Sequence, residues 1–312
     1  MNIIFMGTPD FAVPSLKKLI DDNEIEISAV VTQPDRKRGR GQKVQFSSIK
    51  KAALKADLKV MQSDNVNNKD FLERLRGFRA DFVVVVAFGQ KLGEELLNLP
   101  KYGCINLHAS ILPEYRGSSP IHKAIIAGKK FTGNTTMYMG PGWDDGDIIY
   151  QQEIKINRDD TVGKLHDKLA ENGAELLQKT LADIEAGSAP RIPQDEDEAS
   201  FAYKIDKELG RINWEESAED IFNLVRGVNP WPGAFSYLNG KRIKIWWVEV
   251  KDITNTKNEA GTIIKANIED GILVQTGDGI ISIKELQVAG GTKISSQDFL
   301  NGHQLEKNQK FN

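Results

Sequence analysis

The sequence predicts an α/β protein with a Rossmann-like, doubly wound and mostly parallel sheet, followed by a small OB-like β-barrel. In the first half, short apolar runs alternate with helical patterns, as in chains built from βαβ units. In the last third, short β-like runs are separated by turn dipeptides such as Asn239-Gly240 and Asp270-Gly271. That spacing is typical of a small antiparallel barrel.

Six apolar runs in the first part are expected to form strands. They cover residues 3–6, 27–32, 58–62, 82–87, 105–108 and 135–139. The run that begins at Phe82 is apolar at every position, as expected of a strand buried on both faces of a parallel sheet. Helical patterns cover residues 11–19, 49–56 and 70–75, and a long helix over residues 161–185 ends just before Gly187.

The pattern of expected elements changes after residue 206, from alternating strands and helices to mostly strands. A helix is expected over residues 218–228, then strands over residues 235–238, 242–248, 261–266, 272–276 and 280–286. Two prolines and the acidic run at residues 195–198 indicate a connection between domains. We therefore predict a Rossmann-like domain over residues 1–188, a linker over 189–206 and a C-terminal barrel over 207–312. A long surface loop within one domain is the alternative for the linker.

Composition limits the partners of the chain. Its 312 residues carry a net charge of −3, so contact with a polyanion must come from a local patch. The single cysteine, Cys104, excludes a disulfide within the chain and falls in a predicted buried strand, where core packing is favoured over a nucleophilic role. The N-terminal residues lack the basic segment of a signal peptide, and no apolar run is long enough to span a membrane. We expect a cytoplasmic monomer without a membrane partner.

The strand predicted over residues 105–108 carries the most informative pattern. Because side chains alternate between the faces of a strand, Asn106 and His108 share one face while Ile105 and Leu107 share the other. The two polar groups then point together past the strand end, where ligands bind in open α/β sheets. A polar edge strand, or a buried pair with its hydrogen bonds satisfied, is the alternative.

The following residues strengthen the functional interpretation. They read Ser110-Ile111-Leu112-Pro113-Glu114-Tyr115-Arg116-Gly117, and a later loop reads Asp144-Asp145-Gly146-Asp147. Together with the Asn-x-His strand, these motifs resemble the folate-dependent formyltransferases. The resemblance implies 10-formyltetrahydrofolate as co-substrate and the catalytic residues Asn106, His108 and Asp144. It also implies a folate-contacting loop formed by Ser110, Ile111, Leu112 and Pro113.

The implied chemistry suits these residue types. Formyl transfer to an amine passes through a tetrahedral intermediate with a developing oxyanion, which the Asn106 amide and a charged His108 imidazole can stabilise. Asp144 can favour the charged imidazole and pass the amine proton on through water. We expect no metal, since Lys155 occupies the position where a calcium loop starting at Asp144 needs an acidic ligand. The turn after the first strand lacks G-x-G-x-x-G, which disfavours a nicotinamide cofactor.

Glycines interleave with the charges of the dense basic run at residues 36–43, so we expect a flexible loop after the second strand. Such a loop indicates contact with a nucleic-acid backbone, with a passive solvated face as the alternative. This run, together with residues 211–214 and 229–234, resembles the branch of the family that acts on methionyl initiator tRNA. In the strand expected over residues 242–248, alternating charges suggest a further RNA-facing stripe, although a half-buried strand with a solvated face explains them equally well. The expected tRNA-binding residues are Arg36, Arg38, Arg40, Lys43, Arg242 and Lys244.

The sequence therefore predicts an enzyme that transfers the formyl group of 10-formyltetrahydrofolate to the α-amino group of methionyl initiator tRNA. A sugar-nucleotide N-formyltransferase with the same catalytic core is the nearest alternative. An RNA-binding protein without activity is a third, and the joint presence of Asn106, His108 and Asp144 argues against it.

Overall fold

The computed structural model describes residues 1–38, 43–252, 257–306 and 309–312. The chain forms two compact units. The first contains Met1–Pro120, Phe131–Lys155 and His166–Tyr203, and the second contains Ile121–Lys130, Ile156–Leu165 and Lys204–Asn312. Among the described helices, none is long and apolar enough to cross a membrane.

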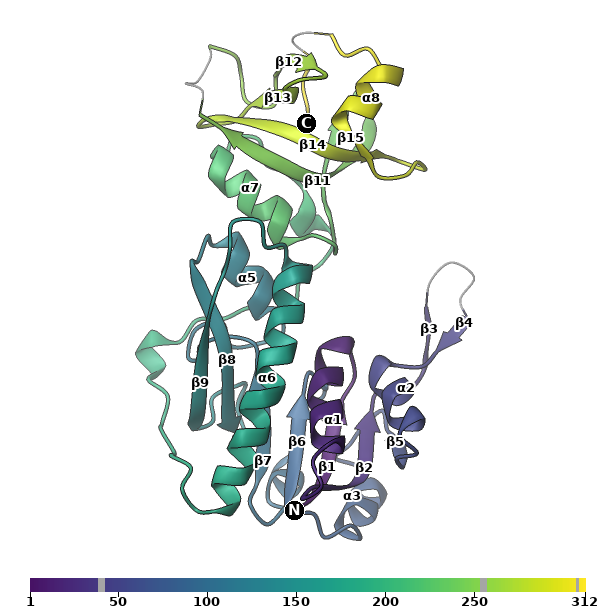
Figure 1. Ribbon diagram of the computed structural model, residues 1–312, viewed down its shortest axis with the longest axis vertical. Helices are drawn as coiled ribbons and strands as arrows, with labels where there is room; N and C mark the ends of the chain where they lie inside the picture. Colours follow the sequence, from purple (N-terminus) through teal and green to yellow (C-terminus); the bar gives the residue numbers. More distant parts are fainter. Residues whose placement is uncertain (39–42, 253–256, 307–308) are drawn as a thin grey trace. The chain divides into compact units, whose positions relative to one another are not determined.

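A seven-stranded sheet organises the first unit and confirms the predicted mostly parallel architecture (Figure 1). Its strand order is β5-β2-β1-β6-β7-β8-β9, in which β8 and β9 run antiparallel to their neighbours and the others are parallel. The strands are β1 (Asn2–Gly7), β2 (Glu26–Thr32), β5 (Val60–Gln62), β6 (Phe82–Val86), β7 (Cys104–His108), β8 (Phe131–Tyr138) and β9 (Ile148–Lys155). The order turns back between β1 and β6, which makes their carboxyl ends a topological switch point.

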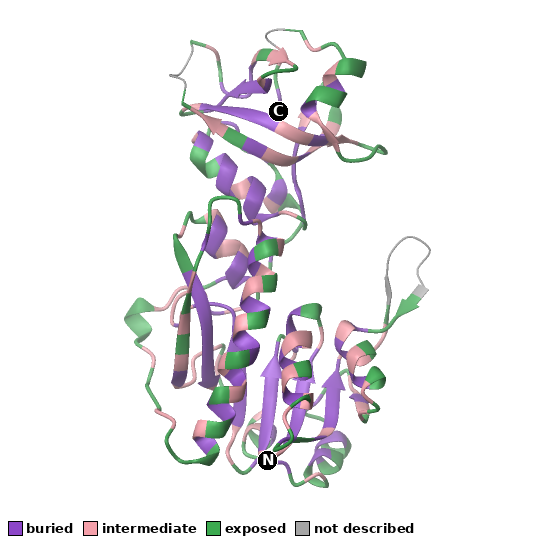
Figure 2. Cartoon of the chain, in the orientation of Figure 1, coloured by how far each residue is buried: buried purple, intermediate pink, exposed green. Residues whose placement is uncertain are grey.

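Helices cover both faces of this sheet. In chain order they are α1 (Val13–Ile20), α2 (Ser48–Lys55), α3 (Lys69–Arg76), α4 (Glu94–Leu97) and α6 (Val162–Glu185). All of α5 (Pro120–Ile126) except Pro120 belongs to the second unit. The central strands are buried along their lengths (Figure 2). On one face, Cys104 shares a core with Phe71 and Leu75 of α3. On the other, α6 approaches β7 so closely that a Cβ at Gly173 would lie 2.7 Å from Leu107.

The basic run differs from the flexible loop expected over residues 36–43. Its ends pair as a short hairpin of β3 (Arg36–Arg38) and β4 (Lys43–Gln45), with Arg36 opposite Gln45. The loop prediction was therefore wrong for these flanks, because backbone pairing overrides the low strand propensity of the sequence. Arg40 lies outside the described residues.

A six-stranded antiparallel sheet organises the second unit. It contains β10 (Ala234–Leu238), β11 (Lys241–Lys251), β12 (Ile263–Asn267), β13 (Gly271–Gln275), β14 (Ile280–Val288) and β15 (Ile294–Ser295), with α7 (Ala218–Gly227) and α8 (Ser296–Gly302) packed on it. The order is β10-β11-β14-β13-β12, with β15 also on β14. Phe311 bridges to Leu238 and Lys310 to Thr262, so the last residues link the two edges. This linkage gives the barrel-like closure that the sequence predicted; β15 and α8 were not predicted.

Candidate active site at the carboxyl ends of the strands

Asn106 lies in the centre of β7, between Val85 of β6 and Met137 of β8. Strand formation is expected here, because apolar Ile105 and Leu107 alternate with it and are buried. The Asn106 side chain is also buried, and it makes no hydrogen bond within the described chain. A buried amide without a protein partner is available for a ligand that offers both a donor and an acceptor.

His108 ends the same strand, on the same face as Asn106. Its Nε2 atom lies 3.0 Å from the carbonyl oxygen of Tyr115. A carbonyl only accepts hydrogen bonds, so Nε2 carries a proton. The other ring nitrogen, Nδ1, lies 3.7 Å from Asp144 Oδ2, which is beyond direct hydrogen-bonding distance.

Asp144 lies in the connection between β8 and β9, with a left-handed backbone at φ +50°. Its Oδ2 atom accepts a hydrogen bond of 2.8 Å from the amide of Gly117. Two non-glycine residues with positive φ, Asp144 and Tyr115, thus flank the His108 ring. Backbone strain of this kind persists where the surroundings over-determine it, and it concentrates at functional sites. His108 and Asp144 thus lie together at the carboxyl end of β7, and Asn106 lies two residues before His108 on the same strand face.

The expected folate-contacting loop is tightly bound to the protein itself. The carbonyl oxygens of Ser110, Ile111, Leu112 and Pro113 accept hydrogen bonds from Thr135 Oγ1, Glu114 N, Gln151 Nε2 and Ser200 N, respectively. The Leu112 amide also donates to Thr135. Leu112 is buried, whereas Ile111 and Pro113 are half-buried. The side chains of Ile111 and Pro113 are therefore the more accessible parts of this loop.

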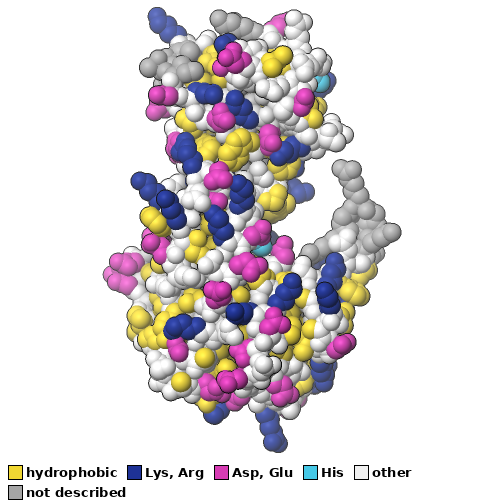
Figure 3. Space-filling model, viewed as in Figure 1, with side chains coloured by type: hydrophobic (Ala, Val, Ile, Leu, Met, Phe, Trp, Pro, Cys, Tyr) yellow, Lys and Arg dark blue, Asp and Glu magenta, His cyan; other side chains and the backbone are white. Residues whose placement is uncertain are grey.

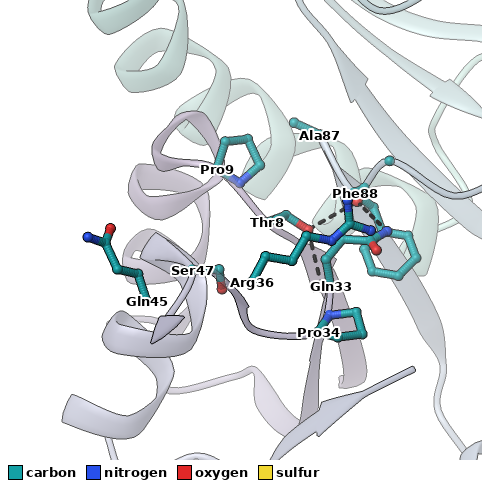
Figure 4. A pocket seen from close by; sticks show the side chains of 10 residues that line it. Thr8, Pro9, Gln33, Pro34, Arg36, Gln45, Ser47, Ala87 and Phe88 are labelled. Atoms are coloured by element: carbon teal, nitrogen blue, oxygen red, sulfur yellow. Dashed lines mark hydrogen bonds between the residues drawn. The ribbon is translucent and has the colours of Figure 1, made fainter. Parts of the chain in front are cut away.

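A cavity of about 290 Å³ lies at the switch point (Figure 4). It is lined from the carboxyl ends of β1, β2 and β6 by Thr8, Gln33 and Phe88, among others. Thr8 Oγ1 donates to the Phe88 carbonyl at 3.0 Å, and Gln33 Nε2 donates to the same oxygen at 3.3 Å. The Arg36 side chain extends across the cavity toward these groups. Sequence reasoning noted the turn at Thr8 but missed Gln33 and Phe88, although the switch-point rule would have pointed to both.

Strand register places this cavity beside the predicted catalytic residues. Val86 of β6 lies between Gly7 of β1 and Leu107 of β7. The next residues on these three strands are Thr8, Ala87 and His108, so they follow one another across adjacent strands at a spacing of about 5 Å. Thr8 and Ala87 line the cavity. His108 therefore lies one strand away from the cavity wall.

The expected tRNA-binding residues are placed in different ways. Arg36 is exposed at the cavity rim, and the Arg38 and Lys43 backbones pair in the hairpin. In the second unit, the Arg242 guanidinium lies 3.7 Å from the Phe235 ring centre, and the Lys244 ammonium lies 5.2 Å from that of Trp246. On the face shown in Figure 3, the described basic and acidic side chains of this unit are intermingled. In the sequence, the run over residues 36–43 is therefore the more concentrated candidate.

Two family models match the sequence. The first, described as formyl transferase, covers residues 1–181, and the second, described as formyl transferase C-terminal domain, covers residues 204–304. The chain belongs to the formyltransferase family. The family models cover the seven-stranded sheet and most of the second unit, as the resemblance of the motifs predicted.

Curated relatives of this formyltransferase share its whole length. The methionyl-tRNA formyltransferase of Halothermothrix orenii is 59% identical over 315 residues, covering 100% of both chains. That of Acetivibrio thermocellus is 45% identical, covering 98% of this chain and 97% of the relative.

Solved structures share the fold at lower identity. The N-formyltransferase from Helicobacter canadensis, in complex with folinic acid and dTDP-3-aminofucose, has a TM-score of 0.67 at 19% identity and covers 94% of this chain and 99% of its own. HypX from Aquifex aeolicus, in complex with tetrahydrofolic acid, has a TM-score of 0.61 at 16% identity. The match covers 98% of this chain and 50% of the HypX chain.

Proposed function

We propose that this formyltransferase moves the formyl group of 10-formyltetrahydrofolate to the α-amino group of methionyl initiator tRNA. The observation that carries the proposal is the cluster of Asn106, His108 and Asp144 beside the cavity at the carboxyl ends of the central strands. The full-length identity of 59% to a curated methionyl-tRNA formyltransferase supports the acceptor. Formylation of a charged tRNA fits the cytoplasmic localisation expected from the sequence.

The reaction forms a bond between the formyl carbon and the amine nitrogen, and it breaks the bond between that carbon and the folate nitrogen. The amine loses a proton and the folate nitrogen gains one. In between, the formyl oxygen carries negative charge. The unpartnered Asn106 amide is proposed to donate to that oxygen, and removal of one such donor typically costs about 10²–10³ in rate.

The role proposed for His108 follows from its two nitrogens. The Tyr115 carbonyl engages Nε2 and fixes the ring, so Nδ1 faces the site. The gap of 3.7 Å between Nδ1 and Asp144 leaves room for that nitrogen to bond a substrate oxygen or a water. Asp144 is proposed to accept the amine proton through such a water. Its Oδ1 atom can take this role, because the Gly117 amide binds Oδ2.

The two substrates need separate places at this edge. The cavity has polar groups and the Arg36 guanidinium in its lining, which suit the ribose and phosphate of an acceptor end. The half-buried side chains of Ile111 and Pro113 suit an apolar wall for the folate. We therefore propose that the acceptor enters at the switch point and the folate approaches across the loop that follows β7.

The proposal is tested by supplying radiolabelled 10-formyltetrahydrofolate together with methionyl initiator tRNA, uncharged initiator tRNA or a dTDP-amino sugar. Formyl transfer to the charged tRNA alone is the expected result. Transfer to the amino sugar alone would replace the proposal with the sugar-nucleotide alternative. A parallel titration should show binding of folate and none of a nicotinamide dinucleotide.

Asp144→Asn is the matched variant for this assay. The amide keeps an oxygen for the Gly117 amide but cannot accept a proton, so turnover should fall by about 10²–10⁴ with substrate binding nearly intact. Near-normal turnover in this variant would remove Asp144 from the mechanism.

A further inference from the structure

A segment far along the chain from the catalytic loops lies against both of them. Residues 192–202, which we call the strap, belong to the first unit. The Ile192 and Ile148 backbones exchange hydrogen bonds of 2.8 and 2.9 Å. The Ser200 carbonyl accepts from the Arg116 amide at 2.8 Å, and the Ala202 amide donates to the Arg116 carbonyl at 2.7 Å. The strap therefore pairs with the loop that follows β7 over several residues.

Gln194 joins the strap to the Asp144 loop. Its Nε2 atom donates to the carbonyl oxygen of Asp144 at 2.8 Å and to that of Gly146 at 2.7 Å. Its Oε1 atom accepts from Arg116 Nε at 3.0 Å. Because a guanidinium only donates and a carbonyl only accepts, these partners permit a single orientation of the Gln194 amide.

Arg116 is in turn fixed. Its side chain is 3% exposed, and its two terminal nitrogens bind the two oxygens of Glu196 at 2.9 and 2.8 Å. The bond from Glu196 raises the pKa of Arg116, and the same bond lowers the pKa of the exposed Glu196. A buried guanidinium held by two parallel hydrogen bonds has little rotational freedom, so Arg116 is a firm anchor for Gln194.

Asp144 is thus held by two hydrogen bonds, and both of the groups that hold it are connected to Arg116. Its carboxylate is bound by the amide of Gly117, the residue after Arg116, and its backbone carbonyl is bound by Gln194. Its φ of +50° is unfavourable for a non-glycine residue and requires such external constraints. Loss of the Gln194 bonds would free the loop to relax toward an ordinary backbone and turn the carboxylate away from His108.

We propose that Gln194 is a positioning residue that, through Arg116, holds the Asp144 carboxylate facing His108 Nδ1. The inference rests on the proposed function in so far as it predicts an effect on formyl transfer. It assigns an effect on turnover to Gln194, a residue of the strap that lies 50 positions after Asp144 in the sequence.

The test uses Gln194→Met in the full chain. Methionine keeps the length of the side chain and its contact with Met137, but it donates no hydrogen bond. Turnover should fall about 10- to 100-fold with both KM values within about twofold, because misplacement of a catalytic group affects the transition state more than ground-state binding. Gln275→Met in the second unit is the control, since Gln275 also donates to two backbone carbonyls, those of Thr276 and Gly279.

Coupling with Arg116 separates positioning from a general loss of stability. Arg116→Lys removes the bond to Gln194, so the double variant Gln194→Met/Arg116→Lys should lose little more turnover than the worse single variant. Fully additive losses would show that the two residues act independently and would overturn the chain of contacts. A loss of turnover in Gln275→Met equal to that in Gln194→Met would overturn it as well.

Amide hydrogen exchange gives a readout that needs no substrate. In Gln194→Met, the Gly117 amide should exchange at least about tenfold faster because its carboxylate acceptor has moved, while the Ala202 amide stays protected. Unchanged Gly117 protection would overturn the proposal. If the unmodified protein formylates no charged tRNA, the proposed function fails, and the exchange measurement still decides whether Gln194 positions Asp144.

Discussion

At the scale of single residues, the imidazole of His108 shows how the backbone selects a chemical role. The Tyr115 carbonyl engages Nε2, so that nitrogen is not free for a substrate unless the loop moves. The ring nitrogen left open to a ligand is then Nδ1, which faces Asp144. Tyr115, whose carbonyl faces the ring, has a left-handed backbone at φ +60°.

Cys104 illustrates the opposite case, a potentially reactive group made inert by burial. The thiol lies in the core and contacts the Leu96 carbonyl at 3.5 Å. Burial raises its pKa from 9.0 to about 12. The thiol therefore remains protonated in the folded protein at neutral pH and is no candidate nucleophile.

The raised pKa of Cys104 predicts a loss of stability in alkali. Between pH 9 and about 12 the unfolded chain gives up the thiol proton while the folded protein retains it. The folded state then binds more protons, so the free energy of unfolding falls as pH rises, by up to about 1.4 kcal/mol per pH unit. Below pH 9 the contribution is fully present.

Urea denaturation between about pH 8 and 10.5 measures this effect as the difference between the unmodified protein and Cys104→Ala. The variant lacks the group, so its stability should fall less steeply with pH, whatever its stability at neutral pH. Parallel curves for the two proteins would contradict the assignment.

At the scale of elements, the strap and the loop after β7 depend on a glycine. Gly117 has φ +113°, and a Cβ there would lie 2.8 Å from the Ala202 carbonyl oxygen. Gly117→Ala should therefore combine backbone strain with a steric conflict against the strap, and it should lower stability by about 1–3 kcal/mol and turnover as well.

Gly187 provides the matched comparison. It has φ +71°, but a Cβ there would meet nothing within 4 Å. Gly187→Ala should cost about 1 kcal/mol from backbone strain alone and leave turnover unchanged. Thermal denaturation and kinetic assays of both variants separate strain from contact. Equal effects at the two sites would show that the approach of the strap to Gly117 is unimportant.

The run over residues 36–43 carries the densest basic charge of the sequence. Replacing Arg36, Arg38 and Arg40 with glutamine should weaken tRNA binding. The slope of log affinity against log salt should fall by about 0.7–0.9 for each phosphate group that the variant no longer neutralises. Filter binding across a range of salt concentrations measures this slope.

The exposed lysines Lys55, Lys59 and Lys69 supply a control with the same change in net charge. Their replacement by glutamine should leave the salt slope unchanged. If both triple variants lower the slope equally, net charge rather than the hairpin governs binding. An unchanged slope in the arginine variant would move the search to Arg242 and Lys244.

The sequence predicted some elements better than others, for physical reasons. The strand beginning at Phe82 was clear because it is apolar throughout and buried on both faces. β9 was missed, although Ile148 starts a partly alternating pattern, because its exposed half is polar and lies at the sheet edge. Motifs pointed to Asn106, His108 and Asp144 as candidates, whereas Gln194 has no local signal. Its partners lie about 50–80 residues away, and only the fold brings them together.

At the scale of the whole molecule, the second unit is assembled from three stretches of chain. Arg226 of α7 shows the consequence, since it is buried and donates to the carbonyl oxygens of Asn157 and Asp160, both at 3.3 Å. Burial lowers the pKa of this guanidinium. The carbonyls that compensate for its burial come from Ile156–Leu165, well before the C-terminal stretch.

A fragment of residues 204–312 should therefore be less stable than the same unit in the full chain. Arg226→Met should cost about 1–3 kcal/mol more in the full chain than in the fragment, because the fragment lacks the Asn157 and Asp160 carbonyls and keeps the bond from Arg226 Nε to Asn223. Urea denaturation of the four proteins measures the difference. An equal cost in both contexts would show that the carbonyls contribute nothing.

The same discontinuity limits how such chains can be recombined. A crossover between two diverged relatives at residue 204 would combine α7 from one parent with Ile121–Lys130 and Ile156–Leu165 from the other. Gly227 packs so closely on Ile126 that a Cβ would lie 2.6 Å from its side chain, so a larger residue on either parent would clash. The C-terminal region is thus not a transferable cassette, and a viable chimera would have to inherit all three stretches from one parent.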